Sequence, residues 1–152
     1  DGTNQTYSLQ TNQCEIPMNL HETARQIRVL LADDNAYFMK CICNMLSGHA
    51  WLQIVGSASN SDECLALVAE LLPDVVVLDM EIPDVNGFEI TKRIKSLSTK
   101  PRIIILSLYD EPEYREGGQR LGIYGYVAKD EAATYLIPML QNLYQENANS
   151  QT

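Results

Sequence analysis

The sequence predicts a doubly wound α/β sandwich, in which helices cover both faces of a parallel five-stranded sheet. Strand-like runs rich in β-branched residues alternate along the chain with segments that have helical spacing. Three of these runs are almost continuously apolar, as expected of strands that are covered on both faces. The length of 152 residues suits a single domain.

The expected elements follow one another in order. Strands are expected at 27–33, 52–58, 74–79, 102–107 and 124–128, with the sequences IRVLLAD, LQIVGSA, DVVVLD, RIIILS and YGYVA. Apolar residues at helical spacing lie between or after them, namely Phe38, Cys41, Ile42 and Met45, then Cys64, Leu67, Val68 and Leu71, then Ile90, Ile94 and Leu97, and finally Leu136, Met139, Leu140 and Leu143. Right-handed crossovers between parallel strands then place helices on both faces.

Two of the expected helices are unusual. The fourth, EPEYREGGQRLG, has only Tyr114 and Leu121 as apolar anchors and carries Gly117 and Gly118 between them. Each glycine costs about 1 kcal/mol relative to alanine in a helix interior, so we expect this helix to be loosely held. The last helix carries a proline at position 138, which predicts a kink or a start near position 134.

Composition and chain ends restrict the class of protein. Residues 1–26 and 146–152 are polar and lack periodicity, so we expect tails around a domain at 27–145. A net charge of −9 disfavours direct nucleic acid contact, because phosphates are held by excess Lys and Arg. No apolar run reaches the roughly 18 residues that a membrane span needs. The four cysteines lack metal-finger spacing and follow no signal peptide, so we expect a reduced, cytoplasmic protein without membrane contact.

Polar side chains gather at the ends of the expected strands. Asp33 and Asp34 follow the first strand, Asp79 ends the third, Ser107 ends the fourth and Lys129 follows the fifth. The carboxyl ends of strands in a doubly wound sheet border one crevice, so we expect these side chains to lie together. Each alone would pass for a helix cap, a turn residue or a surface lysine. Their conjunction on one edge indicates a functional site.

Three carboxylates in one crevice require a cation. At about 4 Å and an effective dielectric constant of about 20, each pair repels by roughly 4 kcal/mol, which exceeds what Lys129 alone offsets. The donors are all oxygens with neither His nor Cys nearby, which favours Mg²⁺. An Asp beside Mg²⁺, with an ammonium and a hydroxyl group aimed at the same space, suits phosphoryl transfer onto that carboxylate.

With these residues, the sequence from Ile27 to about Tyr144 resembles a response-regulator receiver domain, which is a flavodoxin-like fold with strand order 2-1-3-4-5. The resemblance is carried by the pair Asp33 and Asp34, by VVVLDMEIPDVNG around Asp79, by IIILS and by GYVAKD. The chain is most similar to the receivers of LuxR/NarL-type response regulators, which precede a helix-turn-helix DNA-binding domain. The resemblance implies a phosphoacceptor switch of a two-component system, with transcription regulation as the output in that subfamily and no enzymatic turnover beyond its own phosphorylation and dephosphorylation.

The resemblance also implies the chemistry of the site. Asp79 would be the phosphoacceptor, and a sensor histidine kinase or a phosphotransfer protein would be the phosphoryl donor. Asp33, Asp34, Asp79 and the main-chain carbonyl of Glu81 would hold Mg²⁺.

Further residues are implied to bind the phosphoryl group or to respond to it. Ser107 and Lys129 would bond the phosphoryl oxygens, and Tyr126 matches an aromatic side chain that rotates inward on activation. Glu81 and Tyr109 each follow a site residue by two positions, so we expect them to shield the phosphoryl group and set its lifetime. The resemblance is also compatible with a homodimer that forms on phosphorylation.

Three alternatives stay open on sequence grounds. A hydrolase of the haloacid-dehalogenase kind also uses a strand-end Asp and Mg²⁺, but it needs a second Asp where this chain has Glu81. A flavodoxin-like cofactor binder needs a phosphate-binding loop after the first strand, where DDNAY places acids that repel phosphate. A degenerate receiver would act as a phosphorylation-independent interaction module, although all five site residues are present.

Overall fold

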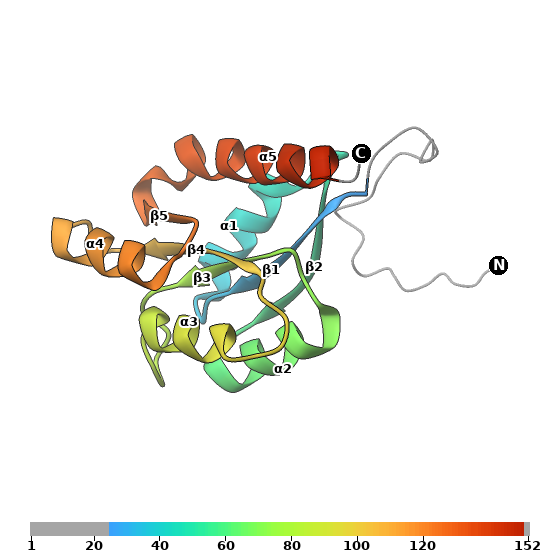
Figure 1. The fold of residues 1–152 in the computed structure, drawn as a ribbon. Coiled ribbons are helices and arrows are strands. Elements are labelled where there is room, and N and C mark those ends of the chain that lie inside the picture. Colours follow the sequence, from blue (N-terminus) through green and yellow to red (C-terminus); the bar gives the residue numbers. More distant parts are fainter. Residues whose placement is uncertain (1–24, 151–152) are drawn as a thin grey trace.

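The structure is a computed structural model that describes residues 25–150, so the predicted tail at 1–26 lies almost wholly outside the described residues. Five parallel strands form one sheet in the predicted order β2-β1-β3-β4-β5 (Figure 1). The strands are β1 (Ile27–Ala32), β2 (Leu52–Ala58), β3 (Val75–Asp79), β4 (Arg102–Ser107) and β5 (Gly125–Ala128). The helices are α1 (Ala36–Leu46), α2 (Ser61–Leu71), α3 (Gly87–Lys95), α4 (Pro112–Leu121) and α5 (Ala132–Ser150), with a short 3-10 turn η3 (Lys129–Glu131) before α5. Within the described residues, no helix is long and apolar enough to cross a membrane.

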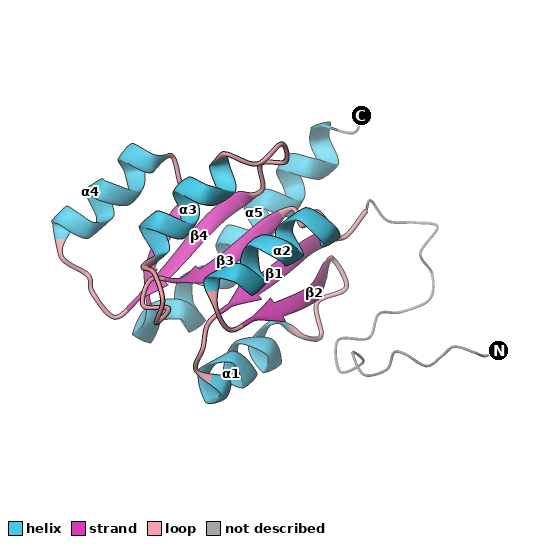
Figure 2. Cartoon of the chain, turned by 90° about the horizontal axis from the view of Figure 1, so that it is seen from below, coloured by secondary structure: helices cyan, strands magenta, loops and turns pink. Residues whose placement is uncertain are grey.

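Helices lie on both faces of the sheet, which explains why the central strands are apolar throughout (Figures 1 and 2). Alternate strand residues such as Val29 and Leu31 pack with α1 and α5, while Leu30 and Ala32 pack with α2 and α3 on the other face. All five residues of β3 are buried. The buried strands therefore hold the residues at their carboxyl ends in fixed positions.

Asparagine caps set the starts of three helices. The side chains of Asn35, Asn60 and Asn86 each accept a hydrogen bond from a main-chain N–H in the first turn of α1, α2 and α3, respectively. Such caps satisfy donors that have no partner inside the helix. All three lie in loops that follow a strand, so they fix where these helices begin at the edge where the site is expected.

The end of α5 differs from the prediction. The helix runs to Ser150 and therefore includes positions 146–150, which the sequence marked as a polar tail. Hydrophobic periodicity ends near Leu143, the last buried residue of the helix, but a helix can continue beyond its buried face. An ion pair between Arg102 and Glu146, with atoms 2.9 Å apart, ties this polar extension to β4.

The start of α5 also differs from one prediction. The helix begins at Ala132 and not near Thr134, and Pro138 lies in its interior. Ala132 and Leu136 are buried against the sheet, so the first turn is held in place ahead of the proline. This packing outweighs the main-chain hydrogen bond that the proline removes.

The fourth helix packs differently from its neighbours. Gly118 is the only buried residue of α4, and Tyr114 is only partly buried. A Cβ atom on Gly118 would lie 2.5 Å from Cδ1 of Ile123, and one on Gly117 would lie 3.1 Å from the ring of Phe88. The two glycines thus let α4 approach its neighbours closely while giving it almost no apolar side chain to bury.

Candidate functional site at the carboxyl edge of the sheet

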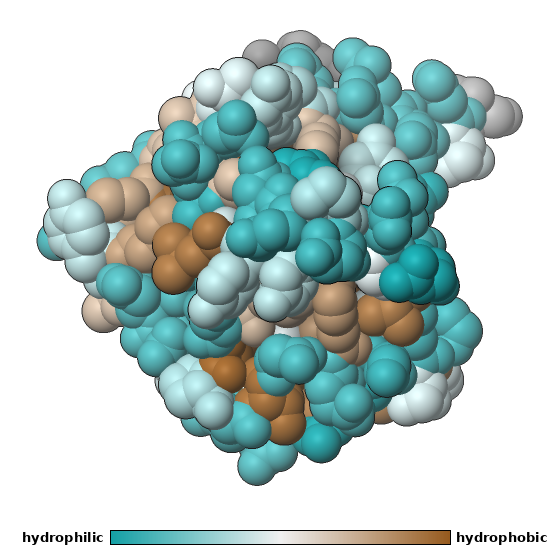
Figure 3. Space-filling model, turned by 90° about the vertical axis from the view of Figure 1, so that its left-hand side faces the viewer, coloured by the Kyte–Doolittle hydropathy of each residue, from teal (hydrophilic) through white to brown (hydrophobic). Residues whose placement is uncertain are grey.

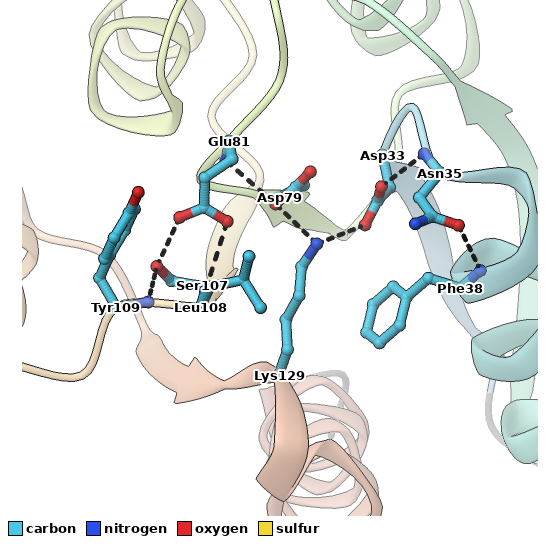
Figure 4. Close-up of polar contacts among 9 residues, drawn as sticks. All are labelled: Asp33, Asn35, Phe38, Asp79, Glu81, Ser107, Leu108, Tyr109 and Lys129. Atoms are coloured by element: carbon cyan, nitrogen blue, oxygen red, sulfur yellow. Dashed lines mark hydrogen bonds and ion pairs between the residues drawn. The ribbon is translucent and has the colours of Figure 1, made fainter.

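Four strand ends place the predicted polar residues in one crevice (Figure 4). Asp33 follows β1, Asp79 and Ser107 are the last residues of β3 and β4, and Lys129 directly follows β5. Asp79 is 3% exposed and Asp33 is 5% exposed. Because a buried carboxylate is costly without a partner, the contacts of these two groups decide what the site can do.

Lys129 is the cationic partner of both buried carboxylates. Its Nζ atom lies 3.1 Å from Asp79 Oδ1 and 3.3 Å from Asp33 Oδ2, and it also lies 4.7 Å from the ring centroid of Phe38. Burial opposes the charge on Lys129, but the hydrogen bond to Asp79 and the charges of Asp79 and Asp33 outweigh it and raise its pKa. The ammonium group is therefore charged at neutral pH.

One ammonium group does not balance the carboxylates. Asp33, Asp34 and Asp79 each offer one oxygen atom, and these atoms all lie within 4.8 Å of one another. Asp33 Oδ1 accepts a hydrogen bond from the N–H of Asn35, whereas the buried Oδ2 accepts none from the described residues although Lys129 is near. Burial and the charge of Asp79 raise the pKa of Asp33 above its ordinary value despite the Asn35 hydrogen bond. An oxygen atom without a hydrogen bond, in a cluster with surplus negative charge, fits a divalent cation that prefers oxygen ligands.

The carboxylate of Asp79 is fixed through one of its two oxygens. Oδ1 contacts Lys129 and also accepts a hydrogen bond of 3.0 Å from the N–H of Glu81. Oδ2 takes part in neither contact. The main chain therefore orients this carboxylate with one oxygen held and the other directed away from the partners that hold it.

The side chain of Glu81 points to Ser107 rather than to solvent (Figure 4). The hydroxyl of Ser107 donates a hydrogen bond of 2.8 Å to Glu81 Oε2, and the N–H of Leu108 donates one of 3.3 Å to Oε1. Burial and the charge of Asp79 raise the pKa of Glu81, although the two hydrogen bonds favour its ionised form. The sequence placed Glu81 near the site but gave no sign of this contact.

Hydrogen bonds continue from Ser107 toward α4. The N–H of Tyr109 donates to Ser107 Oγ over 2.9 Å, and the hydroxyl of Tyr126 donates to the main-chain oxygen of Tyr109 over 2.6 Å. The buried Tyr126 has a raised pKa, chiefly because of burial. The ring of Tyr109 stacks on Tyr114 with centroids 5.3 Å apart, so the site is linked to α4 through two tyrosines. Arg115 on the same helix donates to the main-chain oxygen of Tyr126, a link that the sequence did not indicate.

A third contact that the sequence did not indicate anchors the loop after β3. The carboxylate of Asp84 accepts hydrogen bonds from the N–H and the hydroxyl group of Ser61, the first residue of α2. The hydroxyl group lowers the pKa of Asp84. The two residues are 23 positions apart and belong to no common pattern, so only the fold brings them together. Their contact fixes the loop that carries Glu81.

The face on which the strands end is mostly hydrophilic (Figure 3). Apolar residues form separate small patches there rather than one continuous surface. Leu108 and Tyr109, which follow the site residue Ser107, are 70% and 46% exposed. The polar site thus borders a loop whose apolar side chains are accessible.

The parallel sheet and the lysine-paired carboxylates define a response-regulator receiver domain, and residues 29–141 match this family. The chain belongs to the response regulator receiver domain family. This confirms the family and the fold predicted from the sequence, while the roles of the individual site residues stay predictions.

Relatives and solved structures agree with this membership. The chain is 38% identical over 106 residues to a protein-glutamate methylesterase/protein-glutamine glutaminase of Geobacillus kaustophilus, covering 69% of this chain and 30% of the relative. It is 27% identical over 118 residues to the response regulator GacA of Pseudomonas aeruginosa, covering 78% of this chain and 55% of the relative. The chain therefore spans only about a third to a half of these proteins.

Similar solved structures include the signal receiver domain of the response regulator NarL from Mycobacterium tuberculosis, with a TM-score of 0.74 and 25% identity over 80% of this chain and 98% of that one. The response regulator RcsB of Salmonella typhimurium gives a TM-score of 0.75 and 25% identity over 81% of this chain and 62% of that one. The similarity to NarL agrees with the subfamily that the sequence resembled. The similarity to a methylesterase shows that this receiver resembles those of enzymes as well.

Proposed function

We propose that this domain is a phosphoacceptor switch of a two-component system, in which Asp79 takes a phosphoryl group from a sensor histidine kinase or a phosphotransfer protein. The observation that carries the proposal is the buried Asp79 carboxylate, 3.1 Å from Lys129 Nζ and clustered with Asp33 and Asp34. The domain changes state and turns over no separate substrate. The alternative hydrolase would need an Asp where Glu81 stands.

The contacts of Asp79 support Oδ2 as the attacking oxygen. Lys129 and the N–H of Glu81 both hold Oδ1, which leaves Oδ2 as the oxygen that we assign to the attack. The new bond joins Oδ2 to phosphorus while the bond from phosphorus to the donor's imidazole nitrogen breaks, and the imidazole leaves with the electron pair. No general base is needed, because the carboxylate attacks in its ionised form. Lys129 offsets the negative charge on the phosphoryl oxygens.

The same residues fit Mg²⁺. Asp33, Asp34 and Asp79 would hold the ion together with the main-chain carbonyl of Glu81, and the Asp33 oxygen that lacks a hydrogen bond supports this assignment. When bound, Mg²⁺ supplies positive charge to the phosphoryl oxygens in the transition state. Carboxylates outnumber ammonium groups at the unphosphorylated site, and this excess of negative charge favours binding of a cation.

The response to phosphorylation involves the residues beyond Asp79. Ser107 would bond the phosphoryl group, Tyr126 would adjust with the loop after β4, and Glu81 and Tyr109 would limit access of water to the acyl phosphate. The hydrogen-bonded series from Ser107 through Tyr109 to Tyr126 supports a movement that reaches α4. These roles explain how a small change at Asp79 alters a distant surface.

The output lies outside this domain. Relatives named as response regulators and transcriptional regulators are about twice as long as the match, so we propose that a further domain regulates transcription. The net charge of −9 supports a receiver that makes no DNA contact of its own. We further propose action in the cytoplasm, and a homodimer as the form that phosphorylation favours.

Intact-mass spectrometry tests the proposal. The chain is incubated with Mg²⁺ and acetyl phosphate, with Asp79→Asn as the control. We expect the mass of one phosphoryl group to be added, removable with hydroxylamine, dependent on Mg²⁺ and absent in the variant. Addition of the group to Asp79→Asn at the wild-type level would contradict the assignment of Asp79.

A further inference from the structure

The hydroxyl group of Ser107 already donates a hydrogen bond in the unphosphorylated protein. Ser107 is fully buried, and its single proton lies in the 2.8 Å hydrogen bond to Glu81 Oε2. The hydroxyl also accepts from the N–H of Tyr109 and lies within hydrogen-bonding reach of the Tyr126 hydroxyl, and neither contact gives Ser107 a second proton. Ser107 can therefore donate to only one acceptor at a time.

Glu81 is held close to the acceptor that would compete for this proton. Its N–H bonds Asp79 Oδ1 over 3.0 Å, so its main chain is fixed beside the phosphoacceptor and only its side chain is free to turn away. A phosphoryl group on Asp79 would bring further negative charge next to the Glu81 carboxylate. Repulsion between these anions and the single proton of Ser107 make the two arrangements mutually exclusive.

We propose that Glu81 is an internal competitor of the phosphoryl group. In the unphosphorylated state its carboxylate takes the hydrogen bonds of Ser107 and Leu108, and phosphorylation of Asp79 proceeds to the switched state only when this carboxylate is displaced. This inference rests on the proposed function and concerns the regulation of the same site. Glu81 thereby sets how strongly phosphorylation is coupled to the change of state.

A series of contacts connects the Glu81 carboxylate to α4 at the surface, so its displacement can be transmitted there. Leu108 and Tyr109 are both tied to the pair of Glu81 and Ser107 through their N–H groups. Tyr126 bonds the main-chain oxygen of Tyr109, and the ring of Tyr109 stacks on Tyr114 of α4. Release of Glu81 therefore frees the loop that connects the site to α4.

Binding of beryllium fluoride, which forms a phosphoryl-like adduct on a carboxylate, tests the competition without turnover. The apparent dissociation constant in Mg²⁺ is measured by titration calorimetry for wild type, Glu81→Ala, Ser107→Ala and the double variant. We expect Glu81→Ala to tighten binding about tenfold, because one charge-assisted hydrogen bond no longer has to be exchanged. Ser107→Ala should weaken binding, and most of the gain from Glu81→Ala should disappear in the Ser107→Ala background.

Comparison of these four proteins distinguishes competition for the Ser107 proton from a simple loss of negative charge. Removal of a carboxylate favours anion binding with or without Ser107, so an equal gain in both backgrounds would overturn the proposal. An unchanged dissociation constant for Glu81→Ala would overturn it as well. Failure of wild type to bind beryllium fluoride would instead refute Asp79 as a phosphoacceptor, which is the proposed function itself.

A second measurement needs no phosphoryl analogue. The variant Glu81→Gln keeps the size of the side chain and one carbonyl acceptor, and it serves as the conservative variant beside Glu81→Ala. Amide hydrogen exchange at Leu108 should become faster in the order wild type, Glu81→Gln, Glu81→Ala, while exchange in β3 stays at the wild-type level. Equal Leu108 exchange in all three proteins would show that Glu81 does not hold this loop.

Discussion

The two halves of the site are built in opposite ways. Asp33 and Asp79 stand at the ends of β1 and β3, whose residues are almost all buried between two helical layers. The half formed by the loop after β4 and by α4 has exposed Leu108 and Tyr109 and one buried helix residue, Gly118. Groups that attack or bind a cation need fixed positions, whereas a responding surface must move at low cost. Under the proposed function, the chemistry would therefore stand on the rigid half and the response on the loosely packed half.

The interactions that hold each half differ in kind. On the rigid half, burial of apolar strands fixes the backbone, and Lys129 offsets part of the charge of the carboxylates. On the responding half, single hydrogen bonds from Ser107, Leu108 and Tyr126 connect one residue to the next. Each such bond contributes about 1 kcal/mol, so a phosphoryl group is able to rearrange them.

The largest expected effect comes from removal of the cation on the rigid half. Lys129→Met should slow phosphorylation by acetyl phosphate about a hundredfold, because no side chain then offsets the charge that gathers on the phosphoryl oxygens. Stopped-flow or mass-based kinetics measure the rate, and Lys92→Met, which changes an exposed lysine on α3, is the matched control. Equal rates for Lys129→Met and the control would remove Lys129 from the chemistry.

A test of stability addresses the carboxylate cluster. Burial raises the pKa of Asp33, so the folded protein binds a proton more readily than the unfolded chain does. The carboxylic acid form is favoured by folding, and this contribution to the free energy of unfolding is lost as the pH rises from about 4 through the raised pKa. Without metal at pH 7, Asp33→Asn should therefore be more stable than wild type by about 1 kcal/mol.

Urea denaturation at several pH values measures this difference. The advantage of Asp33→Asn should shrink as the pH falls toward 4, and Mg²⁺ should stabilise wild type more than the variant. A variant that is less stable than wild type at pH 7 without metal would mean that the ion pair with Lys129 outweighs the burial of Asp33.

Substitution of one glycine in each half by alanine compares the packing of the two halves directly. A Cβ on Gly87 would lie 3.0 Å from the main-chain Cα of Met80 and 3.3 Å from the main-chain oxygen of Asp79, atoms that cannot move without moving the site. Gly87→Ala should destabilise the protein by about 1–2 kcal/mol and slow phosphorylation. At Gly117 the new Cβ would lie 3.1 Å from the ring of Phe88, a side chain rather than main chain, and the substitution gains helix propensity, so Gly117→Ala should cost less stability than Gly87→Ala. Thermal and urea unfolding of both variants give the comparison, and equal losses would erase the distinction between the halves.

The smallest effect concerns two cysteines. Burial, with a contribution from the charge of Glu63, raises the pKa of Cys64 to about 12, whereas Cys41 is exposed. At pH 8, a thiol reagent should label Cys41 quickly and Cys64 only as fast as α2 opens, because the thiolate is the reactive form. Mass spectrometry of labelled peptides, with Cys64→Ser to identify the slow site, measures both rates. Rapid labelling of Cys64 would show that the rigid half opens readily.

Much of this architecture is predictable because parallel sheets gather residues by strand ends. Apolar runs such as VVVLD locate a buried strand, and the topology alone then brings Asp79 beside Asp33 and Lys129. The contacts of Glu81 with Ser107 and of Asp84 with Ser61 were not predictable, since they depend on side-chain rotamers and loop paths that leave no periodic pattern. The extension of α5 to Ser150 was missed for a related reason, because its last turns are polar and carry no hydrophobic period.

Amide hydrogen exchange, measured residue by residue, tests most directly whether the chemistry is rigid and the response mobile. Exchange is compared between α4 with the preceding loop and β3, first in the unphosphorylated protein with Mg²⁺ and then after addition of beryllium fluoride. We predict that α4 exchanges much faster than β3 in the first state, and that the analogue changes exchange in α4 and the loop while β3 stays constant. Exchange in α4 as slow as in β3, unchanged by the analogue, would contradict the account.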